Sequence, residues 1–295
     1  MDCCFRTNPF RLCSGLKVLG SYYAVVFVVW GPKLLDGDAL AYCIIITFNI
    51  LLILASWSYF MVVFRDPGTV PLNWRPTFDE ESLETGSSMM SDYVTPESRA
   101  STWTSEGMER RPGVGYCNRC QNSKPPRCHH CSICQRCVLK MDHHCVWVVN
   151  CVGAGNYKFF LLFLLYTFLE TILDTLALLP HFIKFFGDAT SHSGSSGNLA
   201  VTFVAFILNL AFALSLLCFL IMHTSLLFSN TTTIEVHEKK KGVIWKYDLG
   251  KWKNFEQVFG TKRLLWFLPM ISKEDLENIP ALKGLDFPVR SDAES

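Results

Sequence analysis

The sequence predicts an all-α integral membrane protein with four transmembrane helices. Half of the 295 residues are hydrophobic and the mean hydropathy is positive, a composition typical of membrane proteins rather than of soluble two-domain enzymes. Four stretches are long and apolar enough to cross a bilayer, which takes roughly 20 apolar residues. A block rich in Cys and His separates the second stretch from the third, so two helices are expected on each side of it.

The four predicted transmembrane helices are, in order, Leu16–Leu35, Leu40–Phe64, Lys158–Lys184 and Leu199–Phe228. Arg6 and Arg11 precede the first of them, as basic residues do in a secretory signal peptide. However, no small-x-small cleavage site follows, and a second apolar stretch begins at once. We therefore interpret the first stretch as a retained transmembrane helix that pairs with the second.

The positive charges near the ends of these helices predict the orientation of the chain. Most of them fall on one side if both termini are cytosolic: Arg6, Arg11, Lys17, Arg65, Lys158 and Lys239–Lys241. The opposite side would hold two loops, 36–39 and 187–198, flanked by Lys33 and Lys184. The Cys/His block is then cytosolic, where thiols stay reduced. A net charge of +1 gives no electrostatic support for a nucleic-acid partner.

The predicted helices divide the chain into six parts. Residues 1–15 form a cytosolic N-terminus, 16–64 the first helical hairpin, and 65–113 a cytosolic linker. The Cys-rich domain is assigned to residues 114–157, the second helical pair to 158–228, and a cytosolic tail to 229–295. Within the linker, residues 79–111 are rich in Ser, Thr and acidic side chains with few aliphatic ones, so we expect them to be disordered.

One ligand pattern occurs twice in the Cys-rich domain, offset by fourteen residues. The spacing C-x2-C-x9-H-x6-C is met by Cys117, Cys120, His130 and Cys137, and again by Cys131, Cys134, His144 and Cys151. Each copy offers three thiols and one imidazole, the closed ligand set of a structural tetrahedral zinc site. We therefore predict two structural Zn²⁺ ions that supply folding free energy to a small domain. The alternative pairing places Cys128 or His129 where His130 would bind.

Two cysteines and two histidines of the domain have no assigned metal: Cys128, His129, His143 and Cys145. A third copy of the pattern starting at Cys145 would need a Cys at position 148, which is Val148. Asp142, His143 and Cys145 place an acid, an imidazole and a thiol within four residues. A neutral His143 could take the thiol proton while Asp142 orients the ring, which would make Cys145 a nucleophile. The alternative is that Cys145 is a spare zinc ligand.

The run Asp142-His143-His144-Cys145 in this Cys-rich domain resembles the DHHC protein S-acyltransferases, also called protein palmitoyltransferases. Asp66-Pro67-Gly68, after the second predicted helix, is similar to the DPG motif of that family. Thr232-Thr233-Ile234-Glu235, after the fourth, is similar to its TTxE motif. The family's tail motif is resembled by residues 247–250, Asn254 and residues 258–260. The resemblance therefore covers most of the chain.

The resemblance implies a two-step reaction. Cys145 would attack the thioester of a long-chain acyl-CoA such as palmitoyl-CoA, release CoA and form an acyl-enzyme. A cysteine thiol of a membrane-associated protein would then take the acyl group. His143 would be the base and Asp142 its orienting partner, and the two repeated sets would be the zinc ligands. Three tail residues would brace the site or cap a tail helix: Thr233, Glu235 and Asn254.

Contacts to the acyl-CoA are expected from two kinds of side chain. Aromatic residues fall where the family lines its acyl cavity, and cations are candidates for binding the CoA phosphates: Trp147, Phe160 and Phe163, and Lys124 and Arg127. The lipid bilayer is a further partner, because burying an acyl chain is worth about 0.8 kcal/mol per methylene. Cys3 and Cys4 are candidates for acylation themselves. The expected location is an endomembrane, with the Golgi as the first choice on the family resemblance, or the plasma membrane.

Two positions depart from the family pattern. Val146 stands where the family usually has Pro, and Val149 where it usually has Asn. Either change could slow the enzyme by altering the turn that presents Cys145. The competing interpretation is a catalytically weak, zinc-containing membrane adaptor, which would tolerate Cys145→Ser. A zinc-dependent ubiquitin-ligase module is less favoured, because the long gap between metal pairs typical of that class is missing.

Overall fold

The computed structural model describes residues 9–75, 115–187, 196–238 and 245–290. Within them, four helices are long and apolar enough to cross a membrane: Gly15–Leu35, Ala39–Phe64, Tyr157–Lys184 and Asn198–Phe228. Two of these precede the Cys/His-rich region and two follow it, so the predicted fold class is confirmed. Several predictions fall outside the described residues: the disordered stretch 79–111, the basic run Lys239–Lys241, and Cys3 and Cys4.

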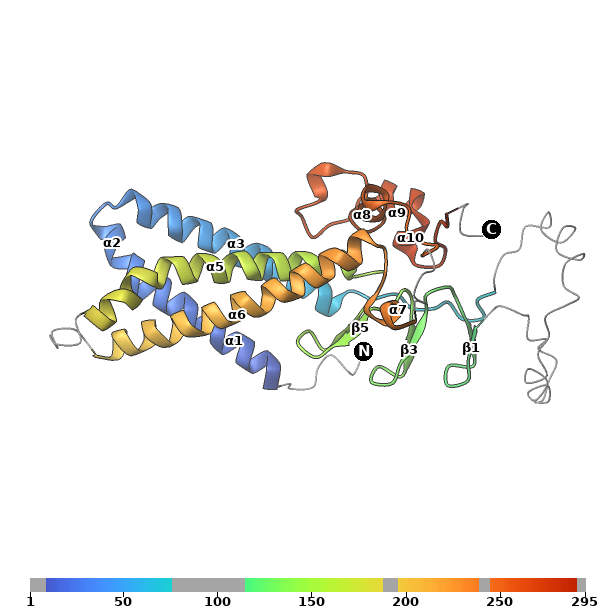
Figure 1. Ribbon diagram of the computed structural model, residues 1–295, viewed down its shortest axis with the longest axis horizontal. Coiled ribbons are helices and arrows are strands. Elements are labelled where there is room, and N and C mark those ends of the chain that lie inside the picture. Colours follow the sequence, from blue (N-terminus) through green and yellow to red (C-terminus); the bar gives the residue numbers. More distant parts are fainter. Residues whose placement is uncertain (1–8, 76–114, 188–195, 239–244, 291–295) are drawn as a thin grey trace, which may run out of the picture.

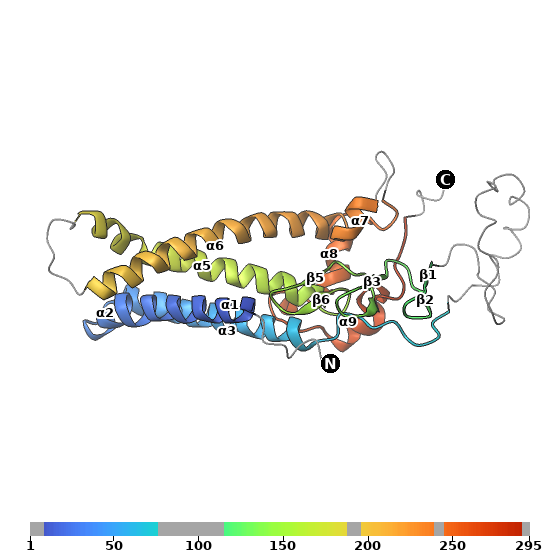
Figure 2. The same ribbon diagram turned by 90° about the horizontal axis from the view of Figure 1, so that it is seen from below.

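The first membrane-spanning stretch consists of three consecutive helical segments, α1 (Pro9–Tyr22), the π-helical η2 (Tyr23–Trp30) and α2 (Gly31–Leu35). Helix α3 (Ala39–Phe64) begins after Asp38, whose side chain accepts a hydrogen bond from the backbone N–H of Leu40 at 2.9 Å. This bond caps one of the free N–H groups of the first turn. Helix α5 (Tyr157–Gly187) packs against both α3 and α6 (Ser196–Phe228), so it is the central helix of the bundle (Figure 2).

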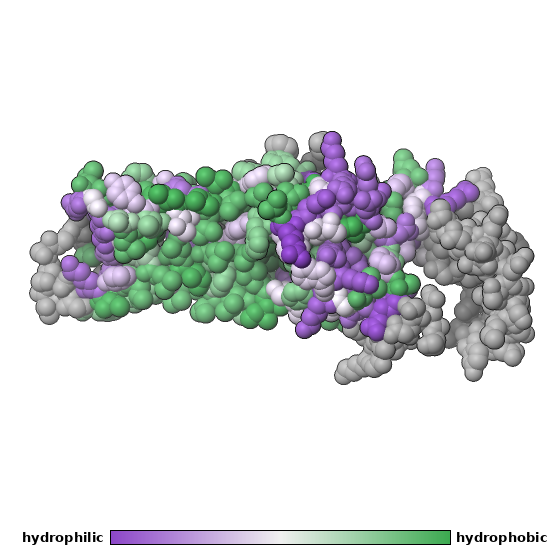
Figure 3. Space-filling model, turned by 90° about the horizontal axis from the view of Figure 1, so that it is seen from above, coloured by the Kyte–Doolittle hydropathy of each residue, from purple (hydrophilic) through white to green (hydrophobic). Residues whose placement is uncertain are grey.

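The outer surface of the helical bundle is apolar, while the end that carries the hairpins and the tail is hydrophilic (Figure 3). Exposed Leu, Ile and Phe side chains cover α3 and α6, among them Ile46, Ile53, Phe60 and Ile221. A continuous apolar surface of this size is expected to face lipid, since water would penalise it. The protein is therefore a multi-pass membrane protein.

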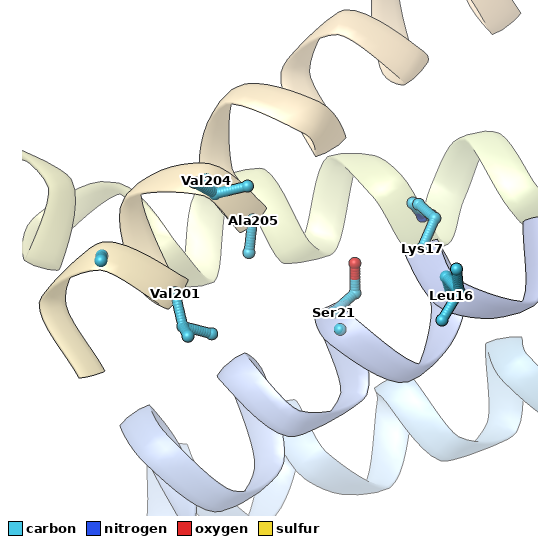
Figure 4. A pocket seen from close by; sticks show the side chains of 8 residues that line it. Leu16, Lys17, Ser21, Val201, Val204 and Ala205 are labelled. Carbon is cyan, nitrogen blue, oxygen red and sulfur yellow. The ribbon is translucent and has the colours of Figure 1, made fainter. Parts of the chain in front are cut away.

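A few polar side chains are buried inside the bundle. Ser21 of α1 and Asn209 of α6 are hydrogen-bonded to each other at 3.0 Å, which satisfies both groups away from water. Beside them a crevice of about 300 Å³ opens between α1 and α6, and Lys17 and Ser21 are its polar lining residues (Figure 4). Glu170 and Asp174 of α5 are also buried. The crevice has no lining residue in common with the site described below.

Three short β-hairpins follow one another between α3 and α5. They pair β1 (Gly115–Cys117) with β2 (Asn122–Lys124), β3 (His129–Cys131) with β4 (Arg136–Val138), and β5 (His143–Cys145) with β6 (Asn150–Val152). Each turn has a left-handed residue at the same place, Gln121, Gln135 and Val149, with φ of 49°, 54° and 54°. The fourteen-residue repeat is thus a structural repeat of three hairpins, although the ligand pattern itself predicts only two copies.

The last hairpin is fixed to the end of α3. Asn150 donates from Nδ2 to the backbone carbonyls of Val62 and Arg65, at 3.0 and 3.1 Å. Gly153, just after β6, lies so close to the 66–68 segment that a Cβ there would come within 2.7 Å of the Pro67 carbonyl oxygen. Only glycine allows this approach. The hairpin that carries Cys145 is therefore held next to the membrane-spanning helices.

The tail folds back against the same end of the bundle (Figure 1). Its helices are α7 (Thr233–Glu238), α8 (Lys251–Phe259), the 3₁₀ turn η4 (Arg263–Leu265), α9 (Lys273–Asn278) and α10 (Pro280–Lys283). Lys158, near the start of α5, donates from Nζ to the carbonyls of Leu265 and Met270 at 2.8 and 2.6 Å. The Tyr166 hydroxyl also donates to the Phe267 carbonyl. These bonds attach the tail to the central helix.

Candidate functional site

Two clusters of three cysteines and one histidine connect the hairpins. The first consists of Cys117, Cys120, His130 and Cys137, and the second of Cys131, Cys134, His144 and Cys151. In each cluster the ligand atoms all lie within 4.8 Å of one another. The first cluster joins the β1–β2 hairpin to β3–β4, and the second joins β3–β4 to β5–β6. The interleaved spacing in the sequence thus becomes a chain of hairpins, each tied to the next.

Both clusters have the donor atoms and the spacing that a tetrahedral metal requires. Bonds of about 2.3 Å to sulfur and about 2.0–2.1 Å to nitrogen would place neighbouring ligands about 3.5–3.8 Å apart. The Cys151 Sγ lies 3.5 Å from Cys134 Sγ and 3.6 Å from His144 Nδ1. In the first cluster, His130 Nδ1 lies 3.3 Å from Cys120 Sγ. Each cluster could therefore hold a metal ion with four protein ligands and no open position.

The alternative ligand Cys128 lies outside both clusters. Its side chain is buried, and this burial raises the pKa of its thiol to about 11. Nδ1 of His130, by contrast, lies with the three thiols of the first cluster, and His129 belongs to neither cluster. The geometry therefore favours His130 as the fourth residue of the first cluster.

Asp142 and His143 form a hydrogen-bonded pair at the start of the third hairpin. The Nδ1 of His143 lies 2.7 Å from Oδ2 of Asp142, whose side chain is almost fully buried. The backbone N–H of Thr233 donates to Oδ1 of Asp142 at 3.0 Å, and the Thr233 hydroxyl donates to its carbonyl oxygen at 2.5 Å. Both carboxylate oxygens are thus engaged, and the ring of His143 is oriented with Nε2 left for another partner.

The pKa values of these groups are shifted in directions that favour a nucleophilic thiol. Burial tends to raise the pKa of Asp142, but the hydrogen bond and charge of His143, the charge of His223 and the Thr233 amide together outweigh it and hold this pKa below its ordinary value. Burial tends to lower the pKa of His143, yet Asp142 and Cys145 raise it to about 9. For Cys145, burial is opposed by His143 and by the amides of Val148 and Trp147, and the net pKa is lowered. Together these shifts favour a thiolate beside an imidazolium.

Arg127 is enclosed in the protein, which corrects the expectation that it contacts CoA phosphates. Its guanidinium forms two bonds to the Glu235 carboxylate, at 2.6 and 2.7 Å, and the two side chains are 1% and 2% exposed. It also lies over the rings of Tyr247 and Phe287. Glu235 in turn accepts from the backbone N–H of Thr232 at 2.8 Å. The pair therefore fixes the segment that presents Thr233 to Asp142.

Asn230 connects this ion pair to the tail, a role that sequence reasoning missed. Its Oδ1 accepts bonds from Arg127 and Lys140, each at 3.0 Å, and its Nδ2 donates to the Tyr247 carbonyl and to Gln257 at 2.8 and 2.9 Å. Burial, followed by the charge of Arg127, holds the pKa of Lys140 well below its usual range. The sequence signal was a polar residue two positions before the TTxE-like motif.

Asn254 joins two elements instead of only capping a helix. Its Oδ1 accepts from the backbone N–H of Leu249, just before α8, at 3.0 Å. Its Nδ2 donates to the Phe228 carbonyl at the end of α6 at 2.7 Å. The last turn of α6 is thereby tied to the start of the tail, next to the segment that contacts Asp142.

The aromatic residues expected to line an acyl cavity lie on two elements. Phe160, on the first turns of α5, packs edge-on against His143 with ring centroids 5.2 Å apart. Phe163 lies one turn further along and packs against Tyr59 of α3 at 5.4 Å. Trp147 lies in the turn of the third hairpin and is partly exposed. Lys124 lies on β2, in the hairpin farthest from the membrane helices (Figure 1), so its contact with CoA stays a prediction.

A second histidine next to the site was also missed. His223, on α6, is buried with its ring centroid 6.0 Å from that of His143 and 5.1 Å from that of Phe160. The sequence did contain a signal, because an ionisable residue within an apolar transmembrane stretch usually has a functional or polar partner.

The sequence of this site was compared with those of known proteins. Residues 112–240 match the family model described as DHHC palmitoyltransferase. The chain is 56% identical to probable protein S-acyltransferase 12 of Arabidopsis thaliana, over 97% of this chain and 99% of that protein. The chain belongs to the DHHC palmitoyltransferase family. Probable protein S-acyltransferase 14 of the same plant is 54% identical over 98% of this chain and 96% of its own length. Palmitoyltransferase ZDHHC20 of Homo sapiens is 33% identical over 92% and 74%.

This DHHC palmitoyltransferase is therefore a protein S-acyltransferase, as the sequence predicted. Membership implies an acyl-CoA and a protein as its two substrates. Its two Cys₃His clusters could bind metal, and its four candidate spans make it a multi-pass membrane protein.

Proposed function

We propose that Cys145 is the nucleophile of this S-acyltransferase, with His143 as its base and Asp142 as the residue that orients the base. The observation that carries the proposal is the 2.7 Å bond between His143 and Asp142, which leaves the other ring nitrogen for the thiol. Support from Thr233 restricts the carboxylate to one orientation. An acid, an imidazole and a thiol in this order form an activated nucleophile.

The reaction balances with these groups alone. The Cys145 thiolate attacks the carbonyl carbon of the acyl-CoA thioester, the bond from that carbon to the CoA sulfur breaks, and the leaving thiolate takes a proton from the His143 imidazolium. In the second step, neutral His143 takes the proton from a substrate cysteine. The new thiolate attacks the acyl-enzyme and Cys145 leaves as a thiolate, which restores the starting state.

The acyl donor is proposed to be a long-chain acyl-CoA such as palmitoyl-CoA, whose chain enters the bundle next to Phe160 and Phe163. The third hairpin is attached to the end of α3, so its thiol lies beside the membrane helices. A thioester can react there while its acyl chain stays among apolar side chains. The acceptors are proposed to be cysteines of membrane-associated proteins exposed at the cytosolic surface.

We propose Zn²⁺ as the metal of both clusters. Bound zinc would hold the three hairpins together and take no part in the reaction, because six thiols and two imidazoles fill both sites. The distribution of Lys and Arg supports a cytosolic hairpin domain and cytosolic termini. A Golgi location is proposed on the family resemblance, and a fluorescent fusion of the full chain would test it.

The test is acyl-enzyme formation by the purified protein with labelled palmitoyl-CoA. We expect hydroxylamine-labile label on the wild type and none on Cys145→Ser. A matched control is Cys43→Ser, which changes an exposed cysteine on α3 and should keep the label. If folded, metal-loaded wild type takes up no label, Val146 and Val149 have disabled the site, and the adaptor interpretation replaces the enzyme.

A further inference from the structure

A buried imidazole lies beside the candidate catalytic pair and takes no part in the reaction steps above. His223 comes from α6, an element far from the third hairpin in the sequence, and its side chain is 1% exposed. A polar ring in an apolar helix is costly to bury unless its nitrogens have partners. Its position therefore calls for a hydrogen-bonding role.

The rings of His223 and His143 both pack against Phe160. The three ring centroids form a compact triangle, with 5.2 Å from His143 to Phe160, 5.1 Å from Phe160 to His223 and 6.0 Å from His143 to His223. Both histidines meet Phe160 edge-on. His223 thus lies next to the imidazole that contacts the Cys145 thiol.

The contact with Tyr157 is compatible with a His223 tautomer that carries its hydrogen on Nε2. The Tyr157 hydroxyl lies 3.4 Å from Nδ1 of His223, and Tyr157 is itself buried. A phenol hydroxyl can donate to an imidazole nitrogen, and the tautomer that accepts at Nδ1 has its hydrogen on Nε2. Among the described residues, Nε2 has no hydrogen-bond partner of its own.

The proposed reaction needs a hydrogen-bond donor at the thioester carbonyl oxygen. Attack on a thioester moves negative charge onto its carbonyl oxygen, and a positioned donor at this oxygen typically contributes 10²–10³ in rate. Asp142 is engaged by His143 and Thr233. The main-chain amides of Trp147 and Val148 are directed at the sulfur of Cys145. The N–H of His223 is the remaining candidate donor to the thioester oxygen.

We propose that His223 donates a hydrogen bond from Nε2 to the carbonyl oxygen of the acyl thioester, and that Tyr157 holds it in the tautomer that can do so. The bond strengthens as the carbonyl π electrons move onto oxygen and weakens when the C=O bond reforms. His223 acts in this way in both the acylation and the transfer step, without gaining or losing a proton. The inference rests on the proposed function of Cys145.

The test compares two reactions of the same thiol in the full-length, metal-loaded enzyme. The first is single-turnover acylation by palmitoyl-CoA, which forms an oxyanion. The second is alkylation by iodoacetamide, read at Cys145 by mass spectrometry, which forms none. In His223→Phe, acylation is expected to fall by about 10²–10³, while alkylation stays within about twofold. The matched control is Thr224→Val, a change at the neighbouring exposed position of α6, which should alter neither rate.

Two further variants separate hydrogen bonding from ring packing. His223→Gln keeps an N–H donor and is expected to acylate at least about tenfold faster than His223→Phe. Tyr157→Phe keeps the imidazole but loses the group that sets its tautomer, so a partial loss of acylation with normal alkylation is expected. If His223→Phe does not fold, Tyr157→Phe still tests the inference.

Three results would overturn the inference: acylation by His223→Phe within threefold of wild type, an equal fall in alkylation, or His223→Gln no faster than His223→Phe. An equal fall in both reactions would mean that His223 only positions His143. Failure of the proposed function is seen separately, as acyl label that persists in Cys145→Ser.

Discussion

Removal of Arg127 should destabilise the hairpins and the tail far more than removal of an exposed lysine. Arg127→Met would leave the Glu235 carboxylate buried, with the Thr232 amide as its remaining hydrogen-bond donor among the described residues. It would also remove the bonds from the guanidinium to Asn230, at 3.0 and 2.8 Å. Breaking a buried pair by removing one partner costs about 3–5 kcal/mol, because the other charge stays buried.

The expected change in Tm follows from this cost. A loss of 1 kcal/mol lowers the Tm of a domain of 150–250 residues by about 2–4 °C, so Arg127→Met should lower it by about 6–20 °C. The control is Lys262→Met. Lys262 and Glu274 form an ion pair of similar length, 2.7 Å, but are 47% and 64% exposed. Exposed pairs contribute little, so this variant should unfold like the wild type.

The assay is thermal unfolding of the detergent-solubilised, metal-loaded protein, in which the unfolding of the hairpins and the tail is measured by their loss of protease resistance. A second comparison uses Arg127→Met/Glu235→Met, which removes both charges and should recover part of the loss, since no charge is left without a partner. The reasoning is refuted if Arg127→Met and Lys262→Met have the same Tm. A double variant less stable than both single variants would contradict it as well.

Three further predictions concern the third hairpin and the metal clusters. Val149 has φ of 54°, a left-handed conformation that a β-branched residue adopts only with strain of roughly 1 kcal/mol; Val149→Asn should therefore raise the Tm, and a lower Tm would contradict this. Asp142 raises the pKa of His143 to about 9, so the charged ring stabilises the fold fully below its unfolded pKa of about 6.5, and this contribution is lost as the pH rises through about 9. The Tm difference between wild type and His143→Gln should accordingly be largest at acidic pH and shrink at alkaline pH. A difference that grows with pH would contradict the stabilising role of the charged His143 ring. Chelation should abolish the protease resistance of the hairpins, and Cys117→Ser should retain about half of the bound metal, as measured by elemental analysis; a purified wild type free of metal would rule out both.

Features that depend on residues close together in the chain could be predicted from the sequence. The membrane helices are uninterrupted apolar stretches, and the structure places them within one residue of the predicted ends. The metal clusters follow from a ligand spacing that recurs fourteen residues later in the sequence. The β-hairpins recur in the structure with the same offset. In both cases the information is local, so pattern and chemistry are enough to identify it.

Interactions between distant segments could not be predicted in the same way. Arg127 resembled a cation available to a phosphate, because its partner Glu235 lies 108 residues further along the chain. His223 and His143 approach each other only because α6 packs beside the start of α5. Burial of a charge and the approach of two rings depend on tertiary packing, for which this single sequence contains no periodic signal.

The third hairpin holds the sulfur of Cys145 in the same way as the second hairpin holds a metal-cluster sulfur. In the second hairpin, the amide of Cys134 donates to the sulfur of Cys131 at 3.3 Å, and Val148 holds the corresponding amide beside Cys145. Where the first two repeats have His130 and His144, the third has Lys158, which binds tail carbonyls instead. The same hairpin geometry therefore presents sulfur to a metal cluster in one repeat and, under the proposed mechanism, to a thioester in the next. It also follows that Val148→Cys would place a second thiol three residues after Cys145, the spacing of a chelating pair, and should make the proposed nucleophile bind soft metals.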